Sequence, residues 1–128
     1  MMKFKVLPCL LFCVMWSACS TSSTITNLTP SQVRRNPSGL YTFEVVFETN
    51  QRSLRHESIQ PAVVIGSEFY RLESAPVLKN RWETLIQIPA DQKFIYYQFK
   101  FDYDYYSMPQ SRSSSRLSPP YKLEILDK

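Results

Sequence analysis

The sequence has few of the residues on which common catalytic and cofactor sites depend. Its 128 residues include only two glycines, Gly39 and Gly66, and one histidine, His56. Two isolated glycines cannot form a Gly-rich loop that cradles phosphates. A single histidine leaves little material for a His-based metal site or a Ser-His-Asp triad. We therefore expect no metal, no cofactor and no enzymatic activity.

Long apolar runs are also missing, apart from one near the N-terminus. Lys3 and Lys5 give a basic start, and the apolar run VLPCLLFCVMW follows. This run of 11 residues would measure roughly 16 Å as a helix, against about 30 Å of bilayer hydrocarbon. It is too short to cross a membrane. A basic start, a short apolar core and small residues after it predict a secretory signal peptide over residues 1–18.

The segment Trp16-Ser17-Ala18-Cys19, followed by the polar run STSST, resembles the lipobox of bacterial lipoproteins. In that family the cysteine becomes the first mature residue and carries a diacylglyceryl group. The resemblance implies lipid attachment at Cys19, and Ser20, rather than Asp, favours the outer membrane of a diderm bacterium. Cleavage there also removes Cys9 and Cys13, so acylation would cap the last thiol. The alternative is ordinary cleavage, with Cys19 unmodified.

The charge of the mature chain is small. The full chain has 15 Lys and Arg, and removal of Lys3 and Lys5 leaves 13, against 11 Asp and Glu. Nucleic-acid binding requires a clustered basic face, so we expect no nucleic-acid partner. We divide the chain into a signal peptide (1–18), a polar tether with lipidated Cys19 (19–24) and a single domain (25–128).

Hydrophobic residues in that domain repeat with a period of two, which predicts strands. The segment 94–105 is the clearest case. Its inward set is Ile95, Tyr97, Phe99, Phe101, Tyr103 and Tyr105. A strand places such a set on one face, whereas a helix would spread it around the axis. The other expected strands are 25–28, 41–48, 59–65, 68–72, 81–88 and 121–126. No segment predicts an amphipathic helix.

Seven short strands joined by polar turns predict an all-β fold, a single antiparallel Ig-like β-sandwich of about seven strands. Two stretches support this by resemblance. ITNLTPSQVRRNPSGLYTFEVVF resembles the start of Ig-like domains of the IPT/TIG kind. RWETLIQIPADQKFIYYQFKFDYD is similar to the middle of early-set Ig-like modules, which include starch- and glycogen-binding ones.

Exposed aromatic and basic residues are the best candidates for a binding surface. Tyr combines apolar area with a polar handle, and sugar rings stack on such faces. Most tyrosines of 94–105 fall on the inward face, so Tyr96, Tyr106 and Trp82 are the candidates for exposure. Arg112 and Arg116 lie in the serine-rich segment 107–118, which we expect to be a loop. They would contact phosphate headgroups or an acidic partner, or else belong to a long mobile hairpin loop.

Asp102 and Asp104 lie two residues apart on an expected strand, so their carboxylates share a face at roughly 7 Å. This separation is within the range of paired acid and base carboxylates. The ordinary interpretation is the solvated face of a strand, and a calcium contact is the next alternative. His56 lies in the polar segment RSLRHES, and we expect a solvated loop histidine there.

Three hypotheses follow. The first is a non-enzymatic envelope lipoprotein whose sandwich binds an envelope protein, for example by strand addition at an exposed edge. The second is a carbohydrate-binding surface module that uses exposed aromatics. The third is an enzyme that uses Asp102 and Asp104. We favour the first.

Overall fold

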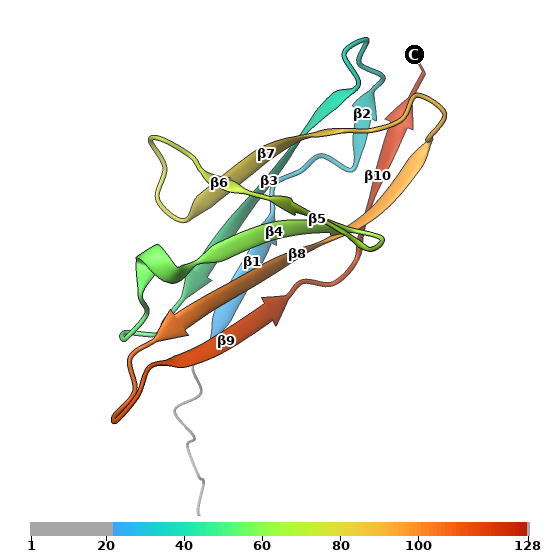
Figure 1. Cartoon of the computed structure of the whole chain (residues 1–128). Coiled ribbons are helices and arrows are strands. Elements are labelled where there is room, and N and C mark those ends of the chain that lie inside the picture. Colours follow the sequence, from blue (N-terminus) through green and yellow to red (C-terminus); the bar gives the residue numbers. More distant parts are fainter. Residues whose placement is uncertain (1–21, 128) are drawn as a thin grey trace, which may run out of the picture.

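The computed structural model describes residues 22–127, which form a sandwich of two β-sheets (Figure 1). Its strands are β1 (Ser23–Asn27), β2 (Gln32–Arg34), β3 (Leu40–Thr49), β4 (Gln60–Ile65), β5 (Glu68–Arg71), β6 (Glu73–Ser74), β7 (Arg81–Gln87), β8 (Phe94–Tyr105), β9 (Arg112–Leu117) and β10 (Tyr121–Leu126). The described residues contain no helix except a 3₁₀ turn, η1 (His56–Ser58). The all-β sandwich is confirmed. The expected signal peptide and Cys19 lie outside the described residues.

The strand order is that of an immunoglobulin-like sandwich. One sheet has the order β1-β3-β7-β6, and the other has the order β2-β10-β8-β4-β5 with β9 paired to β8. These orders correspond to the A-B-E-D and A′-G-F-C-C′ sheets of Ig-like folds. The expectation of a purely antiparallel sandwich was wrong for one pair, because β2 runs parallel to β10. The chain leaves the first sheet after β1 and joins the second sheet at β2.

Three strands were missed, so the structure has ten strands where about seven were expected. β2 and β6 are too short for an alternation to be visible. The prediction that residues 107–118 form a loop was wrong for β9, whose six residues pair with β8 from Tyr105↔Arg112 to Lys100↔Leu117. β9 has one apolar residue in RSSSRL. It is therefore held in the sheet by backbone hydrogen bonds to β8 and not by the burial of an apolar face.

Aromatic side chains from β3 and β8 fill the space between the sheets. The rings of Phe47 and Phe101 stack with centroids 4.4 Å apart, and Phe43 meets Tyr97 edge-to-face at 4.9 Å. Each of these four residues is at most 2% exposed. The alternation of 94–105 is confirmed at Ile95, Tyr97, Phe99, Phe101 and Tyr103, which are buried, while Tyr105 is half-buried. Each buried aromatic ring removes a large apolar area from water, so these rings contribute strongly to the stability of the core.

Ser118 joins β9 to β10 in the buried interior. It is 3% exposed, and its hydroxyl accepts a hydrogen bond from the Phe99 N–H (2.8 Å) and donates one to the Pro119 carbonyl (2.9 Å). Its own N–H donates to the Phe99 carbonyl (2.8 Å). The side chain therefore replaces a backbone partner at the break between the two strands. Ser118 lies between two strands, as expected for a loop residue, but its burial and its hydrogen bonds to β8 were not predicted.

Ser58 plays a similar part beside β8. Its hydroxyl accepts from the Asp104 N–H (2.8 Å) and donates to the Arg55 carbonyl (2.6 Å). This contact holds the connection between β3 and β4 against the last part of β8.

The sandwich has two distinct ends (Figure 1). At the N-terminal end lie the start of β1, the β3–β4 connection (residues 50–59) and the β8–β9 hairpin loop (residues 106–111). At the C-terminal end lie the β2–β3 connection (residues 35–39), the β7–β8 connection (residues 88–93) and the end of β10. β8 runs from one end to the other. β1 begins at Ser23, so residues 23 and 24 belong to the sandwich and not to the expected tether.

Candidate binding surfaces

Three exposed aromatic rings lie on the outer face of the second sheet. Tyr96 is 64% exposed, Phe69 63% and Phe94 45%. Phe94 and Tyr96 are two residues apart on β8, and Phe69 on β5 is opposite Val64, which is opposite Gln98 on β8. Directly opposed residues share a face. We call Phe69, Phe94 and Tyr96 the aromatic face.

Two lysines accompany these rings. Lys122 Nζ lies 4.1 Å from the centroid of the Phe94 ring, and Lys100 Nζ lies 5.5 Å from the centroid of the Phe69 ring. Both distances are within the range of cation–π contacts. The aromatic face is thus apolar area with two lysines beside it, of which Lys100 also lies 3.5 Å from the Asp102 carboxylate.

A cavity of about 610 Å³ borders the aromatic face toward the C-terminal end. Aromatic and polar side chains line it together, among them Glu68, Tyr70, Gln87, Gln92, Phe94 and Tyr96. The Tyr70 hydroxyl donates a hydrogen bond to the Glu68 carboxylate, and this bond raises the pKa of the phenol above its usual value. The cavity therefore offers ring faces beside amide and carboxylate groups.

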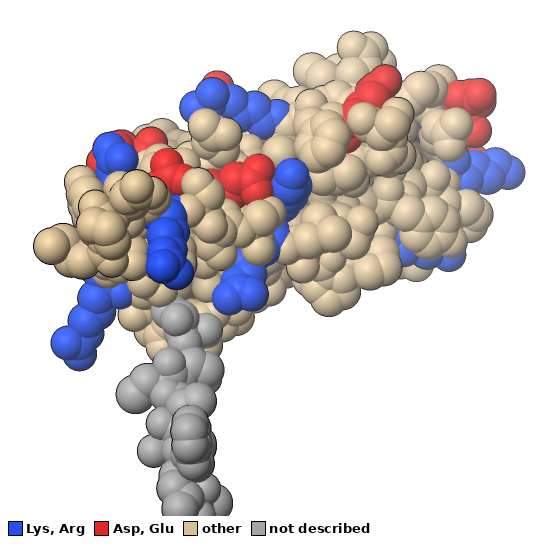
Figure 2. Space-filling view, turned by 60° about the horizontal axis from the view of Figure 1, so that its bottom comes forward, with Lys and Arg blue, Asp and Glu red and all other residues tan. Residues whose placement is uncertain are grey.

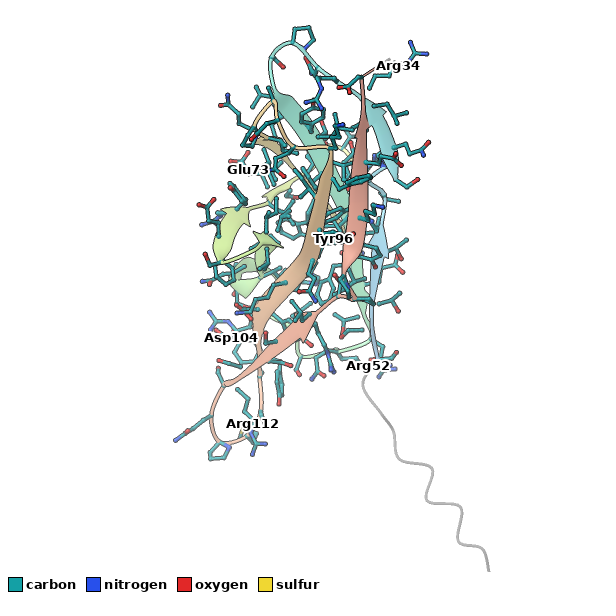
Figure 3. The ribbon with its side chains drawn as sticks, turned by 90° about the vertical axis from the view of Figure 1, so that its right-hand side faces the viewer. Arg34, Arg52, Glu73, Tyr96, Asp104 and Arg112 are labelled. Atoms are coloured by element: carbon teal, nitrogen blue, oxygen red, sulfur yellow. The ribbon has the colours of Figure 1, made fainter. Side chains whose placement is uncertain are left out.

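The candidate aromatics do not share one surface. Tyr96 is exposed in the aromatic face (Figure 3), whereas Tyr106, 62% exposed, follows β8 at the N-terminal end. Trp82 was expected to be exposed, and this was wrong. It is half-buried on β7 opposite Val45, which is fully buried, and packs against the core. The even positions of β7 face inward, and the indole Nε1 is buried without a hydrogen-bond partner among the described residues.

Arg112 and Arg116 both lie on β9, and both are exposed. Arg112 is at the N-terminal end (Figure 3). Arg116 is opposite Phe101, and its guanidinium is one of the groups that lower the pKa of the Tyr103 phenol. Burial raises the pKa of Tyr103, but hydrogen bonds from Ser114, Ser23 and Arg116 outweigh it, so the net pKa is lowered. The two arginines therefore have different surroundings.

Asp102 and Asp104 share the outer face of β8, as expected, and each carboxylate has a neighbour. Asp102 Oδ2 lies 3.5 Å from Lys100 Nζ, and Asp104 Oδ1 accepts a 2.7 Å hydrogen bond from the Ser113 hydroxyl. Serines surround them in a shallow hollow of about 340 Å³. This arrangement is that of a solvated strand face. His56 is exposed in η1, as expected for a solvated histidine.

Two members of the aromatic face, Phe69 and Phe94, were missed as candidates. Phe94 is the first residue of 94–105, the segment with the clearest alternation. Its place among the outward-facing residues of that segment could have predicted that it is exposed. Phe69 lies on a four-residue strand, EFYR, where the face of each side chain depends on the register with β4.

Within residues 22–127 no three His, Cys, Asp or Glu side chains are grouped so that they would hold a metal ion. In the same range, no helix has the length and apolar character needed to cross a membrane. Comparisons with known protein families, curated proteins and solved structures find no match to this chain.

Proposed function

We propose that this protein is a bacterial lipoprotein of the cell envelope, held in the outer membrane by lipid on Cys19, whose sandwich is a non-enzymatic binding module for another envelope protein. The observation that carries the proposal is the aromatic face. Phe69, Phe94 and Tyr96 are 45–64% exposed on one sheet surface. Grouped exposed apolar side chains on a soluble domain are typical of interaction sites.

A protein partner fits the shape and chemistry of this face. Aromatic residues are enriched at the centres of protein interfaces, and charged residues at their rims. Lys100 and Lys122 lie against two of the rings. We expect a partner that places apolar side chains on the rings and acidic groups near the two lysines.

Crosslinked co-purification from membranes tests the binding module. We expect a partner with the wild-type chain and its loss with the double variant Phe69→Ser, Tyr96→Ser. Leu85→Ser is the matched control, because Leu85 is 60% exposed on β7 in the other sheet. If both variants retain the same partner, the aromatic face is not the binding site.

The lipid anchor is tested separately. Intact mass of the mature N-terminus should show acyl groups on Cys19, and Cys19→Ser should release the protein from the membrane pellet. An unmodified thiol, or a serine variant that stays in the pellet, would contradict the anchor.

The cavity favours a second candidate, a carbohydrate-binding module. Phe94 and Tyr96 line a cavity of about 610 Å³ together with Gln87, Gln92 and Glu68. Sugar recognition uses ring stacking together with such hydrogen-bonding groups. Glycan-array binding that disappears in Gln87→Ala, Gln92→Ala, while protein capture persists, would favour this candidate. Absence of glycan binding by the wild-type chain would remove it.

A further inference from the structure

We propose that the N-terminal end of the sandwich is a lipid-binding surface that lies on anionic phospholipid headgroups. Arg52 and Arg112 would meet the phosphates, and Tyr106 and Met108 would enter the interface. The inference goes beyond the proposed lipid anchor and rests on it for orientation. It rests on the length of chain before β1, the charges at this end and the exposed apolar side chains of the β8–β9 hairpin loop.

The chain length leaves this end of the molecule little distance from the bilayer. Ser22 is three residues after Cys19, and three residues extend at most about 11 Å. The headgroup layer of one leaflet is itself roughly 5–8 Å thick. A lipid on Cys19 would therefore keep the N-terminal end within reach of the headgroups at all times.

Ser22 is fixed to the sandwich, so the short connection begins at the folded body. The Ser22 N–H donates to Asn50 Oδ1 (2.7 Å), and the Asn50 N–H donates to the Ser22 carbonyl (3.1 Å). Next along β1, the Ser23 hydroxyl lies 3.4 Å from the Tyr103 hydroxyl on β8. The β3–β4 connection and β8 therefore both lie beside the point where the chain enters.

Unpaired positive charge gathers at this end. Arg52 and Arg112 are exposed, and neither forms an ion pair with a carboxylate among residues 22–127, while Arg55 is paired with Glu57 at 3.2 Å. Both free arginines lie at the end from which the grey trace leaves (Figure 3). In Figure 2, blue side chains border the grey segment and the red ones of this view lie farther from it. Basic residues at a membrane surface are attracted to anionic lipids.

The hairpin loop adds apolar side chains to this charge. Met108 is 94% exposed and Tyr106 is 62% exposed. The Arg55 guanidinium lies 5.4 Å from the centroid of the Tyr106 ring. Tyrosine is favoured at membrane interfaces because its ring is apolar and its hydroxyl stays hydrated. Exposed arginines beside projecting apolar side chains are a combination that favours binding to the surface of a bilayer.

Vesicle partition of the unlipidated mature chain (residues 19–128, Cys19→Ser) tests the surface without the anchor. We compare vesicles of phosphatidylcholine alone with equal mixtures of phosphatidylcholine and phosphatidylglycerol. We expect binding to the mixed vesicles, reduced by at least about 25-fold in Arg52→Glu, Arg112→Glu: about fivefold for each of the two positive charges removed, with further loss from the two carboxylates added. Tyr106→Ser, Met108→Ser should also weaken binding.

Arg34→Glu is the matched control, because Arg34 is an exposed arginine at the C-terminal end (Figure 3). It should change partition by less than about twofold. Equal effects of Arg34→Glu and the double reversal, or no preference for anionic vesicles, would overturn the inference. A bare thiol at Cys19 would overturn the anchor instead, so the two failures are distinguishable. Unchanged thermal unfolding of each variant excludes misfolding as the cause.

Orientation of the lipidated protein provides a second measurement. A fluorescent label at Ser111→Cys should be quenched by spin-labelled lipid, and a label at Ala90→Cys should not. Both positions are exposed and lie at opposite ends of the sandwich. Equal quenching at the two positions would contradict the proposed orientation.

Discussion

The two ends of the sandwich use the same strand for different chemistry. β8 begins at Phe94 and Tyr96, beside the large cavity, and ends at Tyr105, where a hairpin loop with an exposed methionine leads to Arg112 at the start of β9. Its inward side chains are much alike along its length. The outward side chains change from aromatic to acidic and serine-lined. The core therefore fixes the fold, while the outward positions differentiate the two ends.

The buried tyrosines of β8 repeat this contrast. The Tyr97 hydroxyl accepts a hydrogen bond from the Asn27 amide (2.8 Å), and burial raises the pKa of the phenol. The Tyr103 phenol, near the N-terminal end, has a lowered pKa because hydrogen bonds from Ser114, Ser23 and Arg116 outweigh its burial. The two phenols thus differ in the direction of their pKa because Tyr103 has more polar neighbours, Arg116 on β9 among them.

The largest expected effect is that of a core substitution that destabilises both ends of the sandwich at once. Phe99 is fully buried midway along β8. Phe99→Ala should lower the free energy of unfolding by about 3–5 kcal/mol, because it leaves a cavity between the sheets. Denaturant unfolding with hydrogen exchange at both ends checks this. Two separate transitions would show that the ends are independent units.

An intermediate effect is expected at the junction of β9 and β10. Ser118→Ala removes the acceptor of the Phe99 N–H and should cost about 1–3 kcal/mol, because a buried donor is left without a partner. Ser115→Ala, at an exposed position of the same strand, is the control and should change stability by less than about 0.5 kcal/mol. Chemical denaturation measures both. An equal cost at the two positions would contradict the role of Ser118.

The smallest effect concerns the two tyrosines in alkaline solution. Tyr103 should ionise below its ordinary value of 10.0, and Tyr97 above it. Ionisation of Tyr103 therefore favours the folded state, and this stabilisation is present above the unfolded pKa and lost as pH falls through the folded pKa. The raised pKa of Tyr97 has the opposite sign, so stability falls as pH rises from the unfolded toward the folded value.

Ultraviolet titration of tyrosinate absorbance separates the two groups. Tyr103→Phe should remove an early step of the titration curve, and Tyr97→Phe a late one. The reverse order would show that Arg116 does not act on the Tyr103 phenol.

The strands that could be predicted from the sequence are those that bury an apolar face of their own. The expected strand 94–105 coincides with β8 because six apolar side chains alternate along it. β9 was missed because RSSSRL carries no such pattern and gains its partner only through the β8 hairpin. A long-range pairing of this kind is not visible in local periodicity.

The candidate surfaces were predictable to a similar extent. Tyr96 was identified because it falls between inward residues of a clear strand, whereas Trp82 was misplaced because aromatic type was given more weight than its position on β7. Grouping Phe69 with Tyr96 required the register of β4 with both neighbours. That Arg52 and Arg112 lie at the same end could not be predicted, because it depends on how the β3–β4 connection and the start of β9, which are far apart in sequence, are arranged in space.

The break at Ser118 also has a consequence for crowding. β9 and β10 follow one another along the same border of β8, and Pro119 and Pro120 stand between them without N–H donors. β2 covers β10, so a neighbouring copy that extended the sheet on this side would meet the three-residue β2, the gap at the two prolines and the exposed arginines of β9 in turn. With the proposed lipid anchor, copies of the chain would meet often in the plane of the membrane, and this interrupted border would disfavour their growth into fibres.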